Sequence, residues 1–152
     1  MADLASEQKQ KFSANYAKDA VYKPGLREFM EYRDLGIEDA THGMVRAHVI
    51  RIKADHKGTD HDMHTTGAHQ HMLDFQMFYV LNGWIKFIYE DQPGEKKFTA
   101  GDCVLQPAKI RHNEIACSDD FEAIEILSPA VHETHSVEDV PGHPDHTAVA
   151  AE

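Results

Sequence analysis

Three histidines and one glutamine are spaced so that they could hold a single metal ion. His69 and His71 are one residue apart, and alternate side chains of an extended strand point to the same face. Gln76 follows after a short excursion, and His112 comes much later, after a proline-containing loop. Imidazoles from two strands can leave open positions on a divalent ion for substrate or oxygen. We therefore predict a mononuclear metal site formed by His69, His71 and His112, with Gln76 as a weaker fourth ligand.

Gln76 and Glu114 are the candidate catalytic residues beside this site. Gln76 either ligates the ion or is an interior hydrogen-bonding residue that orients a ligand or water without touching the metal. Glu114 stands two residues after His112, so the two side chains should share the inward face of one strand. There Glu114 could accept a hydrogen bond or act as a general base. The alternative is a rim carboxylate that faces solvent.

The remaining histidines have simpler explanations. His61 and His64 lie in the polar loop before the metal-site histidines. They could line the mouth of a pocket, although histidines in surface loops are common. Another group falls in an acidic C-terminal stretch with few large apolar residues, where we expect solvated side chains. That group comprises His132, His135, His143 and His146.

Many short strands are expected to position these residues. Residues 44–54 alternate partly between two faces, and residues 75–90 place Asn82-Gly83 between two β-rich runs, a typical hairpin signal. Further short strands are predicted at 98, 103–105, 114–116 and 121–127, with a turn at 91–95. Short, closely spaced strands indicate an all-β sandwich or barrel. Residues 3–20, rich in Ala, Glu, Gln and Lys, predict an N-terminal helix.

The spacing of these residues resembles the two signature motifs of the cupin superfamily, specifically its small single-domain (cupin 2 type) members. The first motif is matched by His69-x-His71, four residues, Gln76, six residues and Gly83. In the family, glutamate usually stands where this chain has Gln76. The second motif is matched by Gly101, Pro107 and His112, whereas Lys109 and Ala116 replace its second glycine and its asparagine. The resemblance covers roughly residues 64–127, and the joint spacing is much more specific than a single His-x-His.

This resemblance implies an all-β double-stranded β-helix, or jelly-roll barrel, over residues 44–128. Residues 1–43 would supply an N-terminal helical segment and the first strands. Residues 129–152 would form an acidic, histidine-containing tail that either lies over the barrel or is loose in solvent. The resemblance also implies one divalent transition-metal ion per chain, with Fe(II) favoured and Zn, Ni, Cu or Co as alternatives. Gln76 is neutral and cannot offset the positive charge of the ion as a glutamate would. The resulting cationic site favours anionic or enolisable substrates that chelate through two oxygens.

Three functions follow as expectations from the resemblance. Three-histidine cupins similar to this pattern include iron-dependent dioxygenases of β-diketones and of small thiols. The leading expectation is therefore an oxidoreductase, an Fe(II)-dependent dioxygenase of a small, β-diketone-like chelating substrate. The second is a metal-assisted isomerase or lyase that does not use oxygen. The third is a ligand-binding or regulatory barrel whose metal is structural or vestigial.

Composition and charge narrow the expected partners. Fifteen basic and twenty-six acidic side chains give a formal net charge of −11, which repels nucleic-acid phosphates and anionic membranes. No run approaches the roughly 20 apolar residues that span a bilayer, and the polar start lacks a signal-peptide core. We therefore expect a cytoplasmic protein that binds a small molecule. The resemblance to the cupins implies in addition a homodimer or higher homo-oligomer, since small barrels of this family often dimerise by pairing sheets. Cys103 and Cys117 are expected to be buried, reduced thiols.

Overall fold

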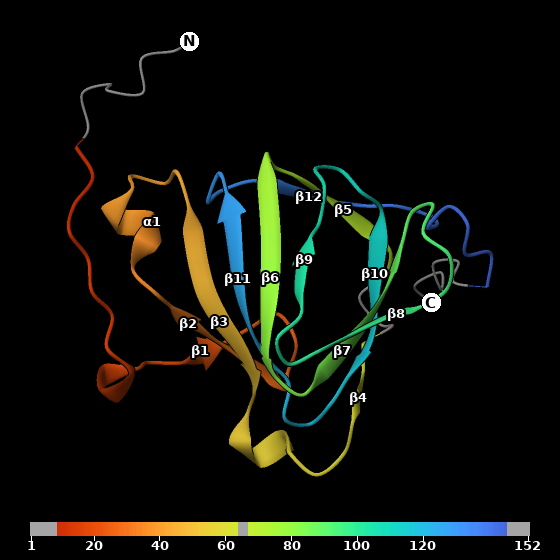
Figure 1. Ribbon diagram of the computed structural model, residues 1–152, viewed down its shortest axis with the longest axis horizontal. Helices are drawn as coiled ribbons and strands as arrows, with labels where there is room; N and C mark the ends of the chain where they lie inside the picture. The colour runs from red at the N-terminus through yellow and green to blue at the C-terminus, as the bar shows by residue number, and fades with distance from the viewer. Residues whose placement is uncertain (1–8, 64–66, 146–152) are drawn as a thin grey trace.

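Two antiparallel sheets face each other and form the body of the molecule (Figure 1). The computed structural model describes residues 9–63 and 67–145. The first sheet has the order β1 (Lys23–Pro24), β2 (Met30–Asp34), β3 (Arg46–Ile52), β11 (Glu122–Ser128), β6 (Phe75–Asn82) and β9 (Cys103–Leu105). The second has the order β12 (Glu133–Ser136), β5 (His69–Met72), β10 (His112–Cys117), β7 (Trp84–Tyr89) and β8 (Lys96–Thr99), with β4 (His61–Asp62) paired to β10. The short helical elements are η1 (Ala17–Asp19), α1 (Ile37–Ala40) and η2 (Ala54–His56).

Alternation along the strands fills the space between the sheets. On β6, Phe78 and Val80 are buried, whereas Phe75 and Tyr79 on the other face are exposed. Phe78 stacks on Phe87 of the opposite sheet, with ring centroids 5.3 Å apart. Burying one such phenylalanine contributes roughly 1.5–3 kcal/mol. The buried residues between the sheets, which include Phe78 and Phe87, therefore stabilise the packing of one sheet on the other. The all-β prediction is confirmed, and the predicted strands from residue 44 to residue 127 are present.

The predicted N-terminal helix is wrong for the described part of that segment. Residues 9–20 are extended apart from the single 3-10 turn of η1, and residues 3–8 lie outside the described residues. Phe12 is 96% exposed, so it has no apolar surface to pack against. Helix propensity is a weak preference that packing must support. Here the Lys11 amide donates instead to Ala40 O, which holds the segment extended along the barrel.

The turn at Asn82-Gly83 is also not the predicted hairpin. Its two flanking strands, β6 and β7, exist but belong to different sheets, so the turn is a corner that carries the chain across the barrel. Gly83 has φ +66°, and a Cβ there would collide with Ser118 Oγ and lie 2.9 Å from the Phe121 nitrogen. Glycine is therefore needed both for the left-handed backbone and for this close approach.

Replacing Gly83 with alanine is expected to lower the free energy of unfolding by about 3 kcal/mol. About 1–2 kcal/mol comes from the left-handed conformation, and a further 1–3 kcal/mol is typical of overpacking. Urea denaturation measures the difference. Gly94→Ala is the matched control, because Gly94 has φ +68° but no atom within 4 Å of a built Cβ. Equal losses in both variants would contradict the close-packing argument.

The two cysteines lie in different environments. Cys117 is buried, and burial raises the pKa of its thiol to about 12. Cys103 is exposed on β9, so the prediction that both thiols are buried holds only for Cys117. Among the described residues, no helix is long and apolar enough to span a bilayer.

Candidate metal centre

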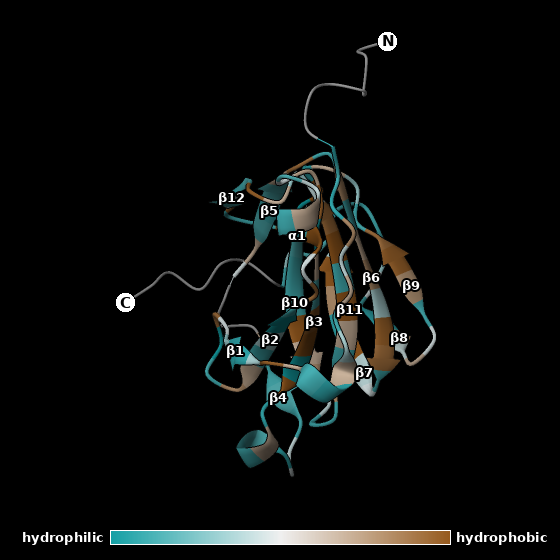
Figure 2. Ribbon diagram, turned by 90° about the vertical axis from the view of Figure 1, so that its left-hand side faces the viewer, coloured by the Kyte–Doolittle hydropathy of each residue, from teal (hydrophilic) through white to brown (hydrophobic). Residues whose placement is uncertain are grey.

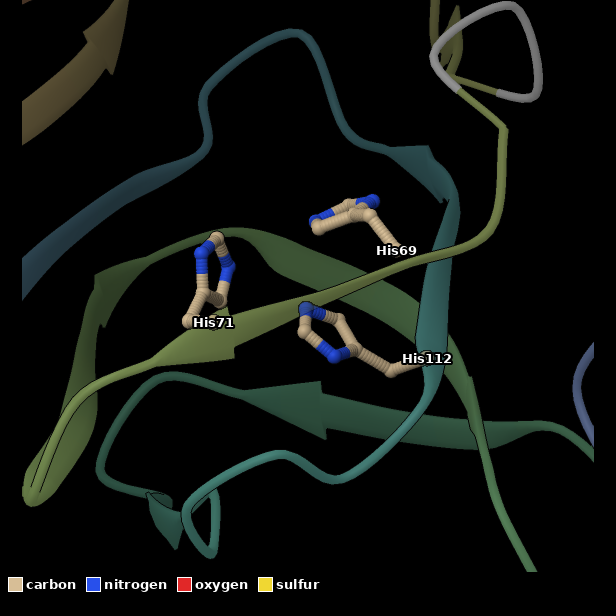
Figure 3. A group of neighbouring side chains, drawn as sticks. All are labelled: His69, His71 and His112. Carbon is tan, nitrogen blue, oxygen red and sulfur yellow. The ribbon is translucent and has the colours of Figure 1, made fainter. Parts of the chain in front are cut away.

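His69, His71 and His112 come together on the inner face of the second sheet (Figure 3). His69 and His71 alternate on β5, and His112 begins β10 directly opposite His69 in the strand register. One candidate ligand atom from each histidine lies within 4.8 Å of those from the other two. The three residues therefore form a group of the size that can surround one ion.

In all three histidines Nδ1 is engaged in a hydrogen bond. His69 Nδ1 lies 3.0 Å from Gly67 O, and His112 Nδ1 lies 3.0 Å from Ile110 O. His71 Nδ1 lies 2.9 Å from the hydroxyl of Thr134 on β12. A carbonyl can only accept, so the first two histidines carry a proton on Nδ1, and in the neutral form of each ring Nε2 is then the atom with a free lone pair.

His112 Nε2 provides the clearest sign that these residues fit a metal. This atom is buried and has no hydrogen-bond partner among the described residues. Buried polar atoms are almost always satisfied, so an orphaned one calls for an explanation. A metal ion bound by Nε2 while Nδ1 donates to a carbonyl is the usual arrangement of histidine ligands.

Burial keeps the imidazoles of His71 and His112 in the neutral form that binds metals. It lowers the pKa of His71 to about 4, and the neighbouring His112 and His69 add to that effect. Burial likewise lowers the pKa of His112. Protons therefore compete weakly for these two candidate ligands near neutral pH.

Gln76 points inward from β6 and is 4% exposed. Its Nε2 donates to Glu125 Oε2 at 3.0 Å, and the other oxygen of Glu125 lies 2.8 Å from His48 Nε2. These three residues, His48, Glu125 and Gln76, form a polar row across β3, β11 and β6. The structure shows Gln76 in the hydrogen-bonding role, and ligation through its Oε1 stays a prediction.

Glu125 and His48 were not singled out from the sequence. Glu125 is ionised, because the hydrogen bond and charge of His48 and the hydrogen bond from Gln76 outweigh burial and lower its pKa. The available signal was a carboxylate on the inward face of β11, where its neighbours Ala123 and Leu127 are apolar. Whether Glu125 points into the barrel can be decided only once the register of the strand is known.

Glu114 shares the inward face with His112, as predicted, and the solvent-facing alternative is wrong. Its side chain is 15% exposed, and Oε2 lies 3.3 Å from Arg27 Nη2 and 3.7 Å from His69 Nε2. Burial raises its pKa, but the combined charges of His69, His112 and Arg27 bring the pKa below its ordinary value. An ionised carboxylate therefore stands beside a candidate ligand atom.

Two of the three histidines, His69 and His71, line a cavity of ≈ 540 Å³, a volume that suits a small molecule. Its polar lining includes His48, His69, His71, Gln76, Glu114, Glu125 and His132. Its apolar lining includes Met30, Met63, Phe78, Ile85, Phe87 and Phe121. Hydrophilic residues cover β5 and β12 at one end of the molecule (Figure 2). The cavity thus joins a polar, metal-binding end to an apolar wall.

The other histidines depart from the sequence expectations in part. His61 stacks on Phe29 with centroids 4.4 Å apart and is not part of the cavity lining, and His64 lies outside the described residues. The prediction of solvated C-terminal histidines is wrong for His143, which is 7% exposed, and for His132, which lines the cavity. His135 is exposed as expected, and His146 is not among the described residues.

Comparison with known proteins identifies the fold. No protein-family model matches the chain, and no curated protein matches it by sequence. Among solved structures, KdgF from Halomonas sp. has a TM-score of 0.58 at 18% identity, over 77% of this chain and 94% of that one. An RmlC-like cupin from Shewanella frigidimarina has a TM-score of 0.56 at 20% identity, over 81% and 96% of the two chains.

Oxalate decarboxylase from Bacillus subtilis is a third similar structure. It has a TM-score of 0.56 at 17% identity, and the match covers 88% of this chain but 33% of that one. These similarities agree with the two facing antiparallel sheets and with the motif spacing. The chain therefore has the cupin fold, and it brings together the three histidines that the resemblance assigns as metal ligands.

Proposed function

We propose that this protein is a mononuclear metal enzyme that acts on a small, oxygen-chelating substrate, and that it is an Fe(II)-dependent dioxygenase. The observation that carries the proposal is the convergence of three histidines, each held through Nδ1, at the polar end of a cavity. A divalent ion bound there supplies Lewis acidity and, if it is Fe(II), electrons for the reduction of oxygen. Three protein ligands leave room for a bidentate substrate.

The charges around the cavity favour an enolisable substrate over a permanently multivalent anion. Gln76 alone would leave the centre cationic, but the carboxylates of Glu114 and Glu125 also line the cavity and are ionised. Their charges oppose a second anionic group close to the ion. A β-diketone-like molecule enters neutral and needs to lose only one proton to chelate. The apolar wall around Phe78 and Phe87 would desolvate its carbon skeleton.

Oxygen uptake tests the dioxygenase proposal. The protein is stripped of metal, loaded anaerobically with Fe(II), and mixed with oxygenated buffer and a panel of β-diketones, small thiols and enolisable acids. We expect one molecule of oxygen consumed per molecule of β-diketone cleaved, and no uptake above background by the metal-free protein. An iron-loaded sample that consumes no oxygen with any member of the panel contradicts the proposal.

Glu114 supports a second candidate, a metal-assisted isomerase or lyase that does not use oxygen. Its ionised carboxylate lies 3.7 Å from His69 Nε2, within reach of a substrate that contacts the ion. Such a carboxylate can remove a proton next to a carbonyl without a change of oxidation state. Product formation under strict exclusion of oxygen, with Zn(II) as effective as Fe(II), would favour this candidate over the dioxygenase. Tight ligand binding without turnover would favour a regulatory barrel.

A further inference from the structure

One metal-site histidine is oriented by a distant part of the chain, unlike the other two. His69 and His112 each donate from Nδ1 to a backbone carbonyl two residues earlier. His71 Nδ1 instead meets Thr134 Oγ1, which belongs to a C-terminal segment, residues 129–143, that we call the strap. When Nε2 of His71 binds a metal, Nδ1 carries the proton and the threonine hydroxyl accepts it in a hydrogen bond.

The strap lies against the strand that carries the histidine pair. Its strand β12 is hydrogen-bonded to β5, with Thr134 directly opposite His71 and Ser136 directly opposite His69. Both strap residues line the cavity. The ring of His132 also lies edge-on to His71, with centroids 5.7 Å apart. The strap therefore contacts His71 through two side chains, Thr134 and His132, and contributes to the cavity lining.

The strap is fixed at both ends by buried residues. Ala130, at its start, is 0% exposed, and Val140 is 1% exposed in a small core with Ile88. At its far end, His143 Nε2 contacts the carbonyl oxygens of Tyr89 and Gln92 at 3.0 and 2.9 Å. Carbonyls only accept, so His143 donates to both. Because β12 itself is a short, exposed edge strand, these anchors hold Thr134 in place.

We propose that Thr134 is a positioning residue for His71 and that the strap completes the metal centre. Thr134 sets the tautomer and the ring orientation of His71, and the anchor at His143 keeps Thr134 in register. Coupling between two equilibria is reciprocal, so a bound metal also strengthens docking of the strap. This inference rests on the metal-binding part of the proposed function and does not depend on the reaction.

Cobalt titration tests the role of Thr134. Visible absorption of Co(II) bound to the metal-free protein gives the affinity and reports the ligand geometry. Thr134→Val keeps the shape but loses the acceptor, and its affinity is expected to fall about 10–100-fold. Thr134→Ser restores the hydroxyl and should bind close to wild type. His135→Gln, on the exposed face of the same strand, is the matched control and should leave the affinity and the spectrum unchanged.

Hydrogen exchange tests the coupling between metal and strap. Amides of residues 133–137 should exchange more slowly in the cobalt-loaded protein than in the metal-free one. His143→Ala should speed the exchange of these amides and weaken cobalt binding, although residue 143 is far in sequence from the three candidate ligands. If wild type binds no cobalt, the metal-binding proposal fails. If wild type binds cobalt and Thr134→Val binds it equally well, the positioning role of Thr134 is wrong.

Discussion

Replacing His112 with alanine is expected to abolish metal binding and the thermal stabilisation that metal gives the protein. Of the three histidines, His112 is the most buried, at 1% exposure, and its orphaned Nε2 has no other role among the described contacts. A ligand present at 100 times its Kd stabilises the folded state by about 2.7 kcal/mol. For a chain of this size that corresponds to roughly 5–10 °C in Tm. Wild type should show this shift with Zn(II), Ni(II) or Co(II), and His112→Ala should show none.

Elemental analysis after dialysis completes the measurement. Wild type should retain close to one ion per chain, and His112→Ala close to none. His56→Ala removes a histidine outside the cavity lining and is the control for loss of an imidazole as such. One ion per chain retained by His112→Ala, with the wild-type shift in Tm, would place the metal somewhere else in the molecule.

The strands of the fold could be predicted because each depends on its own alternation. β3, β6, β7 and the later strands follow the local apolar pattern and the turn residues between them. The corner at Gly83 could not be assigned in the same way, because Asn-Gly suits a tight turn whether the next strand joins the same sheet or the facing one. The corner is supported by contacts that are distant in sequence: Ser118, more than thirty residues away, packs against Gly83, and its hydroxyl accepts a hydrogen bond from the Trp84 amide at 2.8 Å.

In the candidate site, too, the residues that depend on local spacing could be predicted, and those that depend on long-range strand pairing could not. His69, His71 and Gln76 follow from spacing within one stretch, and His112 from the spacing of a second motif. Glu125 and Thr134 lie on strands whose register is set by long-range pairing, and a slip of one residue would turn either side chain to the opposite face. The C-terminal stretch was expected to lie over the barrel or to be loose in solvent, because an acidic segment with few apolar residues cannot fold alone. It lies on the barrel, where β12 pairs with β5 and Ala130, Val140 and His143 are buried.

Replacing Glu114 with glutamine is expected to slow proton removal from an enolisable substrate by about 10²–10⁴-fold, the usual contribution of a general base. The carboxylate is ionised and lies beside His69, so it would face a substrate bound to a metal at this centre. Glutamine keeps the shape of the side chain but cannot accept a proton. Deuterium incorporation into pentane-2,4-dione, followed by NMR with Zn(II)-loaded protein in the absence of oxygen, isolates this step from any oxidation.

Two further variants make the assignment specific. Glu122→Gln removes a carboxylate that accepts a hydrogen bond from Asn82 and is not part of the cavity lining, so this variant should exchange like wild type. Glu125→Gln keeps Glu114 but disturbs the row with His48 and Gln76, so we expect weaker substrate binding with a smaller loss of the maximal rate. If Glu125→Gln loses the larger factor and Glu114→Gln exchanges at the wild-type rate, the base is Glu125. In that case the role of Glu114 would be limited to its ion pair with Arg27.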